Sequence, residues 1–228
     1  MKRAAIAFAL AAALAAAPAA APAAAAAAER DWAAAIVATP EGGFRMGNPA
    51  ARVKLVEYVS LTCPHCADFS RTGGPALVEQ VRTGRVSFEI RPYPLDIVAE
   101  VGAQLSRCAA PADAFALNDA ILAGLGETNA RLLALSEAEI GAIDALAPGE
   151  QRQRIASAAG LDAIAARHGL DAAEARACLA DQAGADRVLA IKAAAESIGV
   201  QGTPSFTING VLQQHVHDWA ALAPLIGR

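Results

Sequence analysis

The chain contains few aromatic, methionine and cysteine residues. Of its 228 residues 4% are aromatic, two are Met and four are Cys. The hydrophobic fraction of 55% is inflated by alanine, so core contacts must come mainly from Leu, Ile, Val and Ala on helices. No fixed-period repeat is present, which excludes a repeat architecture. The only low-complexity segment is an alanine- and proline-rich leader.

A hydrophobic run long enough to span a bilayer is also missing. The chain begins with a basic head at residues 1–3, and an apolar stretch follows at residues 4–17. Pro18 and Pro22 interrupt its continuation, which favours a secretory signal peptide over a membrane anchor. The leader has no cysteine for a lipoprotein anchor. Residues 1–28 are therefore predicted to be a signal peptide, and the mature protein is expected to be soluble and periplasmic.

Positive charge is scarce. The formal net charge is −4, and loss of the leader removes Lys2 and Arg3 and makes it −6. This balance argues against a nucleic-acid partner. The 200 residues that remain of the 228 suit one domain that holds an inserted subdomain.

One C-x-x-C motif, Cys63-Pro64-His65-Cys66, follows the apolar run 53–59 and precedes a helix-like segment. A strand, a C-x-x-C and a helix in this order are typical of a redox-active dithiol. The N–H groups of a helix N-terminus stabilise a thiolate, so Cys63 is the predicted nucleophile. Pro64 suits the first helical turn, and His65 places an imidazole beside the sulfur. Cys66, one turn further in, is the predicted resolving thiol.

Hydrophobic periodicity predicts an alternation of strands and helices. The predicted strands lie at 53–59, 86–92, 205–208 and 211–213, the last two joined by an Asn209-Gly210 turn. The predicted helices lie at 66–81, 97–109, 112–124, 136–145, 149–159, 161–168, 172–181, 185–197 and 219–226. The first two strands and the helix between them form a βαβ unit that carries the dithiol.

This order of elements, with Gly202-Thr203-Pro204-Ser205-Phe206 leading into the hairpin, resembles the DsbA family of thiol:disulfide oxidoreductases. The resemblance implies an α/β, thioredoxin-like fold with an inserted helical subdomain. It divides the chain into an N-terminal extension, a first part of the thioredoxin-like domain, a helical insertion and a second part, at 29–52, 53–96, 97–182 and 183–228. It also implies that Pro204 is a cis-proline facing the dithiol and that Thr203 offers its backbone to the substrate peptide.

Glu57 matches an acidic residue that the family carries on the strand before the dithiol. A carboxylate inside an apolar strand should have a raised pKa and could move the proton of Cys66. In an irregular strand, Glu57 would instead point to water. The apolar neighbours Leu55-Val56 and Tyr58-Val59 leave little room for a solvated face, which favours the proton relay.

Cys108 and Cys178 lie on predicted helices of the insertion. The C-x-x-C geometry claims one cysteine pair for itself, so a structural disulfide between these two is our first interpretation. Closing a loop of about 70 residues would stabilise the fold by roughly 4 kcal/mol in the chain-entropy model. Two buried free thiols, or a pair that relays electrons to Cys63, are the alternatives.

A periplasmic metal-binding protein is the alternative of a different class, because C-x-x-C also occurs in metal sites. His65 is close to the thiols, and further ligands could come from His168, His215 and His217. However, the chain has no second C-x-x-C and no H-x-x-x-H, whereas a structural zinc site normally requires four ligands. Copper carriers often add methionines, and only Met46 follows the leader. We therefore predict no metal and no cofactor beyond the redox-active pair.

The sequence predicts an enzyme that donates disulfides to unfolded or reduced secreted proteins through Cys63 and Cys66. A membrane or soluble redox partner would reset the dithiol. A monomer is expected, because the 29–52 segment is too short for the dimerisation domain that precedes this fold in periplasmic isomerases. Thr203 departs from the best-known DsbA and is similar to the residue in isomerase-like or Gram-positive-like relatives. Reductase or isomerase-like activity on specific clients therefore stays the alternative.

Overall fold

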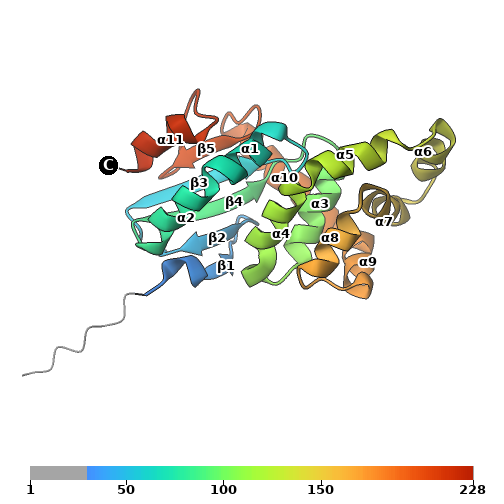
Figure 1. Ribbon diagram of the computed structural model, residues 1–228, viewed down its shortest axis with the longest axis horizontal. Helices are drawn as coiled ribbons and strands as arrows, with labels where there is room; N and C mark the ends of the chain where they lie inside the picture. The colour runs from blue at the N-terminus through green and yellow to red at the C-terminus, as the bar shows by residue number, and fades with distance from the viewer. Residues whose placement is uncertain (1–29, 228) are drawn as a thin grey trace, which may run out of the picture. The chain divides into compact units, whose positions relative to one another are not determined.

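The computed structural model describes residues 30–227, and a mixed sheet forms the framework of one side of this part of the chain (Figure 1). Its six strands are β1 (Ile36–Ala38), β2 (Phe44–Gly47), β3 (Val53–Val59), β4 (Val86–Pro92), β5 (Ser205–Ile208) and β6 (Val211–Leu212), in the order β1-β2-β4-β3-β5-β6. Strands β3 and β4 are parallel, and every other neighbouring pair is antiparallel. The predicted leader, 1–28, lies outside the described residues.

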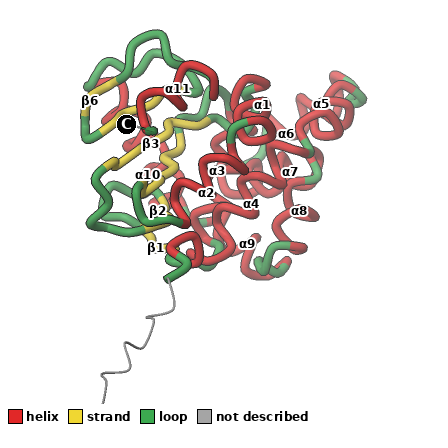
Figure 2. The backbone as a smooth tube through the Cα atoms, turned by 60° about the vertical axis from the view of Figure 1, so that its left-hand side comes forward, coloured by secondary structure: helices red, strands yellow, loops and turns green. Residues whose placement is uncertain are grey.

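Helices pack on the sheet and form a group beside it (Figures 1 and 2). A 3-10 turn, η1 (Trp32–Ala34), precedes β1, and the helices are α1 (Pro64–Thr72), α2 (Gly74–Arg82), α3 (Ile97–Cys108), α4 (Pro111–Ala123), α5 (Leu125–Leu133), α6 (Glu137–Asp144), α7 (Pro148–Ala159), α8 (Leu161–Arg167), α9 (Ala172–Ala180), α10 (Gln182–Ser197) and α11 (Trp219–Ile226). Figure 2 shows the strands on one side and α3 to α9 gathered on the other. This α/β arrangement is the thioredoxin-like fold with helices inserted after β4, which confirms the predicted fold class.

The strand β3 is buried along the face that carries Glu57, whereas on its other face Lys54 is exposed, Val56 is half-buried and Tyr58 is buried. Its neighbours in the sheet place Ile90 and Phe206 on either side of Glu57. Phe206 is fully buried, and its ring centroid lies 4.8 Å from that of Phe69 on α1. This aromatic contact fixes α1, which carries the dithiol, against the strand that follows Pro204.

The N-terminal extension contains structure that the sequence analysis missed. Val53–Val59 was predicted to be the first strand, but β1 and β2 precede it. Residues Phe44–Gly47 pair with β4, and Ile36–Ala38 pair with β2. The extension therefore completes one edge of the sheet.

Two helix predictions were also wrong. The single helix at 66–81 is instead α1 and α2, which meet at Gly73. A Cβ atom on Gly73 would lie 2.8 Å from the Cβ of Trp219, so α11 approaches the chain where the helix breaks. The segment Leu125–Leu133 was given no structure and forms α5.

Candidate active site

The dithiol lies at the start of α1. Cys63 is the N-cap residue and Pro64 occupies the first turn, where the missing N–H of proline costs no hydrogen bond. The loop before it is held by the Thr62 hydroxyl, which donates to the carboxylate of Asp96 at 2.8 Å. Cys63 is 4% exposed and Cys66 is fully buried, and both are free thiols. The nucleophile candidate is thus the more accessible sulfur of the pair.

The two thiols differ strongly in acidity. The pKa of Cys63 is lowered from 9.0 to about 5, first by a hydrogen bond from the Cys66 thiol and further by Thr203 and by the backbone N–H groups of Cys66 and His65, although burial opposes the shift. The pKa of Cys66 is raised, because burial disfavours its thiolate and the Cys63 and Glu57 charges add to this. Near neutral pH, Cys63 is therefore a thiolate and Cys66 a thiol.

The loop before β5 faces Cys63. The Thr203–Pro204 peptide bond is cis, and the carbonyl oxygen of Thr203 lies 3.3 Å from Cys63 Sγ, where it accepts a hydrogen bond from Cys63 when that thiol is protonated. The Thr203 hydroxyl is buried and has no fixed partner in the described part of the chain, which leaves it available to the Cys63 sulfur. The dithiol and the Thr203–Pro204 segment, 140 residues apart in the sequence, thus meet at one site.

Side chains hold the carbonyl groups on either side of Thr203. The Ser205 hydroxyl donates to the carbonyl oxygen of Gly202 at 2.7 Å. His217 Nδ1 lies 2.8 Å from the carbonyl oxygen of Pro204. Because a carbonyl can only accept, this nitrogen must carry the proton. The sequence analysis considered His217 only as a possible metal ligand, and a separation of 13 residues gave no local signal for the contact.

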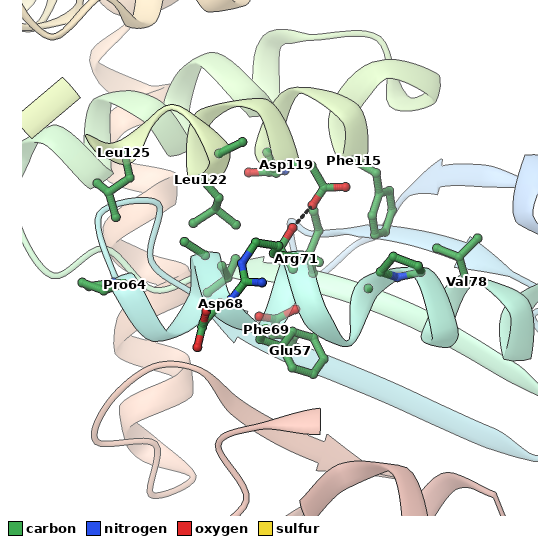
Figure 3. A pocket seen from close by; sticks show the side chains of 18 of the residues that line it. Glu57, Pro64, Asp68, Phe69, Arg71, Val78, Phe115, Asp119, Leu122 and Leu125 are labelled. Carbon is green, nitrogen blue, oxygen red and sulfur yellow. Dashed lines mark hydrogen bonds and ion pairs between the residues drawn. The ribbon is translucent and has the colours of Figure 1, made fainter. Parts of the chain in front are cut away.

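Glu57 is buried beneath the dithiol. It is 5% exposed, and its pKa is raised to about 8, first by burial and then by the negative charges of Asp119 and Cys63. The alternative in which Glu57 points to water is therefore wrong. Glu57 lines a cavity of about 930 Å³ between β3, α1, α2, α4 and α5 (Figure 3). The raised pKa and the charge coupling to Cys66 suit a group that exchanges a proton with that thiol.

The remaining predicted site residues lie in two places. Pro64 and His65 are exposed beside Cys63, and stabilisation of the thiolate by the His65 imidazole stays a prediction. Cys108 at the end of α3 and Cys178 on α9 are joined by a disulfide, with an S–S length of 2.00 Å and Cα atoms 6.2 Å apart. The bridge pairs the cysteines as our first interpretation expected and rules out two free thiols in this structure.

The described residues show no group of three or more His, Cys, Asp and Glu side chains that could hold a metal ion. His168 ends α8, and His217 is engaged with Pro204. Within 30–227, no helix is long and apolar enough to cross a membrane.

Known proteins are similar to this chain in sequence and in fold. The family model described as Thioredoxin matches residues 39–228. A crystal structure of a protein-disulfide isomerase from Novosphingobium aromaticivorans is 32% identical, with a TM-score of 0.73, and the match covers 80% of this chain and 94% of that one. Alpha-DsbA1 from Wolbachia pipientis shares the fold at 23% identity, with a TM-score of 0.61 over 84% of this chain and 92% of that one.

A curated relative from Rickettsia typhi bears the name of a protein-disulfide oxidoreductase. It is 34% identical over 71 residues, which are 31% of this chain. The match spans about a quarter of that relative's length, 26%.

Proposed function

The chain belongs to the DsbA-like thiol:disulfide oxidoreductases of the thioredoxin superfamily, and from this premise we propose that it donates disulfides to reduced proteins through Cys63 and Cys66. The observation that carries the proposal is the difference in acidity between the two thiols. A low pKa makes Cys63 a good leaving group, and the raised pKa of Cys66 makes that thiol hold its proton.

The reaction begins with the Cys63–Cys66 disulfide. A substrate thiolate attacks Cys63, so a mixed disulfide forms, the Cys63–Cys66 bond breaks, and the Cys66 sulfur takes a proton from Glu57. A second substrate thiolate then attacks the substrate sulfur of the mixed disulfide. The substrate disulfide forms, and Cys63 leaves as a thiolate. Two electrons pass from the substrate to the protein.

The acidity of Cys63 also favours transfer of the disulfide from the protein to its substrate. At pH 7 a thiol with a pKa of about 5 is stabilised as thiolate by roughly 2.7 kcal/mol relative to one with a pKa of 9.0. For a two-electron couple this raises the reduction potential by about 60 mV. Stabilisation of the reduced form favours transfer of the disulfide to a substrate.

Thr203 and Pro204 are the proposed substrate-binding residues. The Thr203 carbonyl contacts the Cys63 sulfur, so a peptide joined to Cys63 must pass along this loop. We expect backbone hydrogen bonds between Thr203 and the peptide, as between neighbouring strands.

Variants of the two thiols test the assignment. Cys63→Ser should abolish oxidation of a reduced, unfolded protein, because no other thiolate is placed to react. Cys66→Ser should accumulate mixed disulfides through Cys63, which non-reducing electrophoresis and mass spectrometry detect. Appreciable oxidase activity in the Cys63→Ser variant would refute the assignment.

The proposed compartment is the periplasm, where unfolded or reduced secreted proteins are the substrates. The signal-peptide-like leader and a disulfide outside the active site both suit an oxidising compartment. A membrane or soluble redox partner would reoxidise the dithiol, and we propose that the protein acts as a monomer. Cell fractionation, with N-terminal sequencing of the mature protein, should find it outside the cytoplasm without residues 1–28. Retention of the leader in the cytoplasm would contradict the proposal.

Isomerase activity is the second candidate, because the Novosphingobium relative is named as a protein-disulfide isomerase. Two assays distinguish isomerase from oxidase activity. An isomerase with a reduced Cys63–Cys66 dithiol restores the activity of a substrate protein whose disulfides are scrambled. An oxidase with a Cys63–Cys66 disulfide instead introduces disulfides into a reduced substrate protein.

A further inference from the structure

Glu57 and Asp119 are two of the four carboxyl groups that line the cavity at α1 (Figure 3). Glu57 on β3 is 5% exposed, whereas Asp119 on α4 is exposed to solvent. The walls between them are mainly apolar and include Phe69, Phe88 and Phe115. A volume of about 930 Å³ exceeds many times the roughly 30 Å³ that one water molecule occupies in the liquid. The cavity therefore has room for water, and the two carboxyl groups and the Ser70 hydroxyl are among the polar groups of its lining that could bind it.

Asp119 is tied to the helix that carries the dithiol. The Ser70 hydroxyl donates to Asp119 Oδ1 at 2.7 Å, and the dashed line at Asp119 in Figure 3 marks this hydrogen bond. Ser70 lies one turn after Cys66 on α1, so both occupy the same side of that helix. This hydrogen bond fixes the Asp119 carboxylate relative to the thiols, although Asp119 comes from the helical insertion.

Asp119 also differs from the other charged side chains of the cavity in its ion pairing. The other titratable side chains that line it, apart from Glu57, are Asp68, Arg71 and Glu79. Asp68 pairs with Arg71, and Glu79 pairs with Arg82. Asp119 forms no ion pair with any residue in 30–227.

Within residues 30–227, no basic side chain forms an ion pair with Glu57. Its sheet neighbours are Ile90 and Phe206, and α1 contributes the two thiols. The charges that act on its carboxyl are those of Asp119 and Cys63, and both are negative. Negative charge nearby favours the protonated carboxyl.

We propose that Asp119 acts through Glu57 as the outer group of the proton path, keeping Glu57 protonated near neutral pH and returning protons to it from solvent. This inference rests on the proposed role of Glu57 as the proton donor to Cys66. When the Cys63–Cys66 bond breaks, the Cys66 sulfur takes the Glu57 proton and Glu57 becomes a carboxylate. A proton from bulk solvent then enters the cavity at the Asp119 carboxylate and passes through water to Glu57. This restores the Glu57 carboxyl and leaves Asp119 as a carboxylate.

The test is the pH dependence of the reduction of the oxidised protein by dithiothreitol, corrected for the thiolate fraction of the reagent. In the unsubstituted protein the corrected rate should fall with a midpoint at the Glu57 pKa of the oxidised form. This midpoint should lie below the value of about 8 in the reduced protein, because the disulfide form lacks the negative charge of Cys63. Asp119→Asn removes the charge but keeps an acceptor for Ser70. We expect the midpoint to move to lower pH, and the rate at the midpoint pH of the unsubstituted protein to fall about twofold.

Matched variants separate this role from a structural one. Asp68→Asn alters an exposed carboxylate at the same cavity that is already paired with Arg71, so the midpoint should not move. Asp119→Glu restores the charge and should restore the midpoint. A carbon-13 NMR titration of the Glu57 carboxyl should show its pKa lowered in Asp119→Asn, while the pKa of Cys63 changes little.

An unchanged midpoint and an unchanged Glu57 titration in Asp119→Asn would overturn the inference. The Glu57→Gln variant shows whether the role of Asp119 alone is wrong or the role of Glu57 as well. If Glu57→Gln removes the midpoint but Asp119→Asn does not move it, only the role of Asp119 is wrong. If Glu57→Gln itself leaves the profile intact, the proton-donor role of Glu57 is wrong, and the role of Asp119 with it.

Discussion

The hydrogen bond from the Cys66 thiol is the largest cause of the low pKa of Cys63, so its removal should be a strong perturbation of the nucleophile. Cys66→Ala deletes the donor and leaves the helix N-terminus and Thr203 in place. A hydrogen bond to a charged group contributes about 1.5–3 kcal/mol. At about 1.4 kcal/mol per pKa unit, we expect the Cys63 pKa to rise from about 5 by roughly one to two units.

Cys66→Ser is the matched control, because its hydroxyl can still donate to the Cys63 thiolate. The assay follows the ultraviolet absorbance of the thiolate against pH, with the pH dependence of alkylation as a second readout. The alanine variant should titrate clearly higher than the serine variant. Equal pKa values in the two variants would show that the helix terminus and Thr203 set the acidity without the second cysteine.

Three further perturbations address the surroundings of the dithiol. Thr203→Val removes a hydroxyl beside the nucleophile, so the potential from glutathione equilibration should fall by about 30 mV for each unit that the nucleophile's pKa rises; no change would exclude a role for this hydroxyl. His217→Leu should raise KM for a peptide substrate roughly two- to tenfold, and His217→Asn, which keeps a donor, should largely restore it; an equal effect of both would exclude the hydrogen bond. Replacing Cys108 and Cys178 with Ala should lower the unfolding free energy by about 4 kcal/mol in chemical denaturation without loss of turnover. A folded but inactive double variant would instead support the electron relay.

The strands around the site could be predicted from the sequence because their signals are local. Val53–Val59, Val86–Pro92 and Ser205–Ile208 have the predicted bounds, since each is a short apolar or alternating run with turn residues beside it. Strands β1 and β2 are only three and four residues long, and pairing in the sheet stabilises them. Such segments carry too little periodicity to be recognised alone.

The sequence contains a local signal for the break between α1 and α2, but the helical pattern of hydrophobic residues on both sides of it led to the prediction of a single helix. Gly73-Gly74-Pro75 combines two flexible residues with one that favours the first turn of a helix. The close approach of Trp219 to Gly73 comes from the other end of the chain, so no local pattern reveals it.

The reacting groups were predictable, but the residues that act on them were not. Cys63 and Cys66 share a motif, and the burial of Glu57 follows from its apolar neighbours. The contacts of Asp119 with Ser70 and of His217 with Pro204 join elements that meet only in the folded protein. Exposed aspartate and histidine residues have no sequence pattern that distinguishes them from an ordinary surface.

The reduction potential of the Cys63–Cys66 couple as a function of pH tests the central claim most directly. If Cys63 is a thiolate above about pH 5, reduction takes up two electrons and one proton, because only Cys66 is protonated. Between about pH 6 and pH 7 the potential should then fall by about 30 mV per pH unit. A fall of about 59 mV per unit, as for two ordinary thiols that both take up protons, would contradict the account.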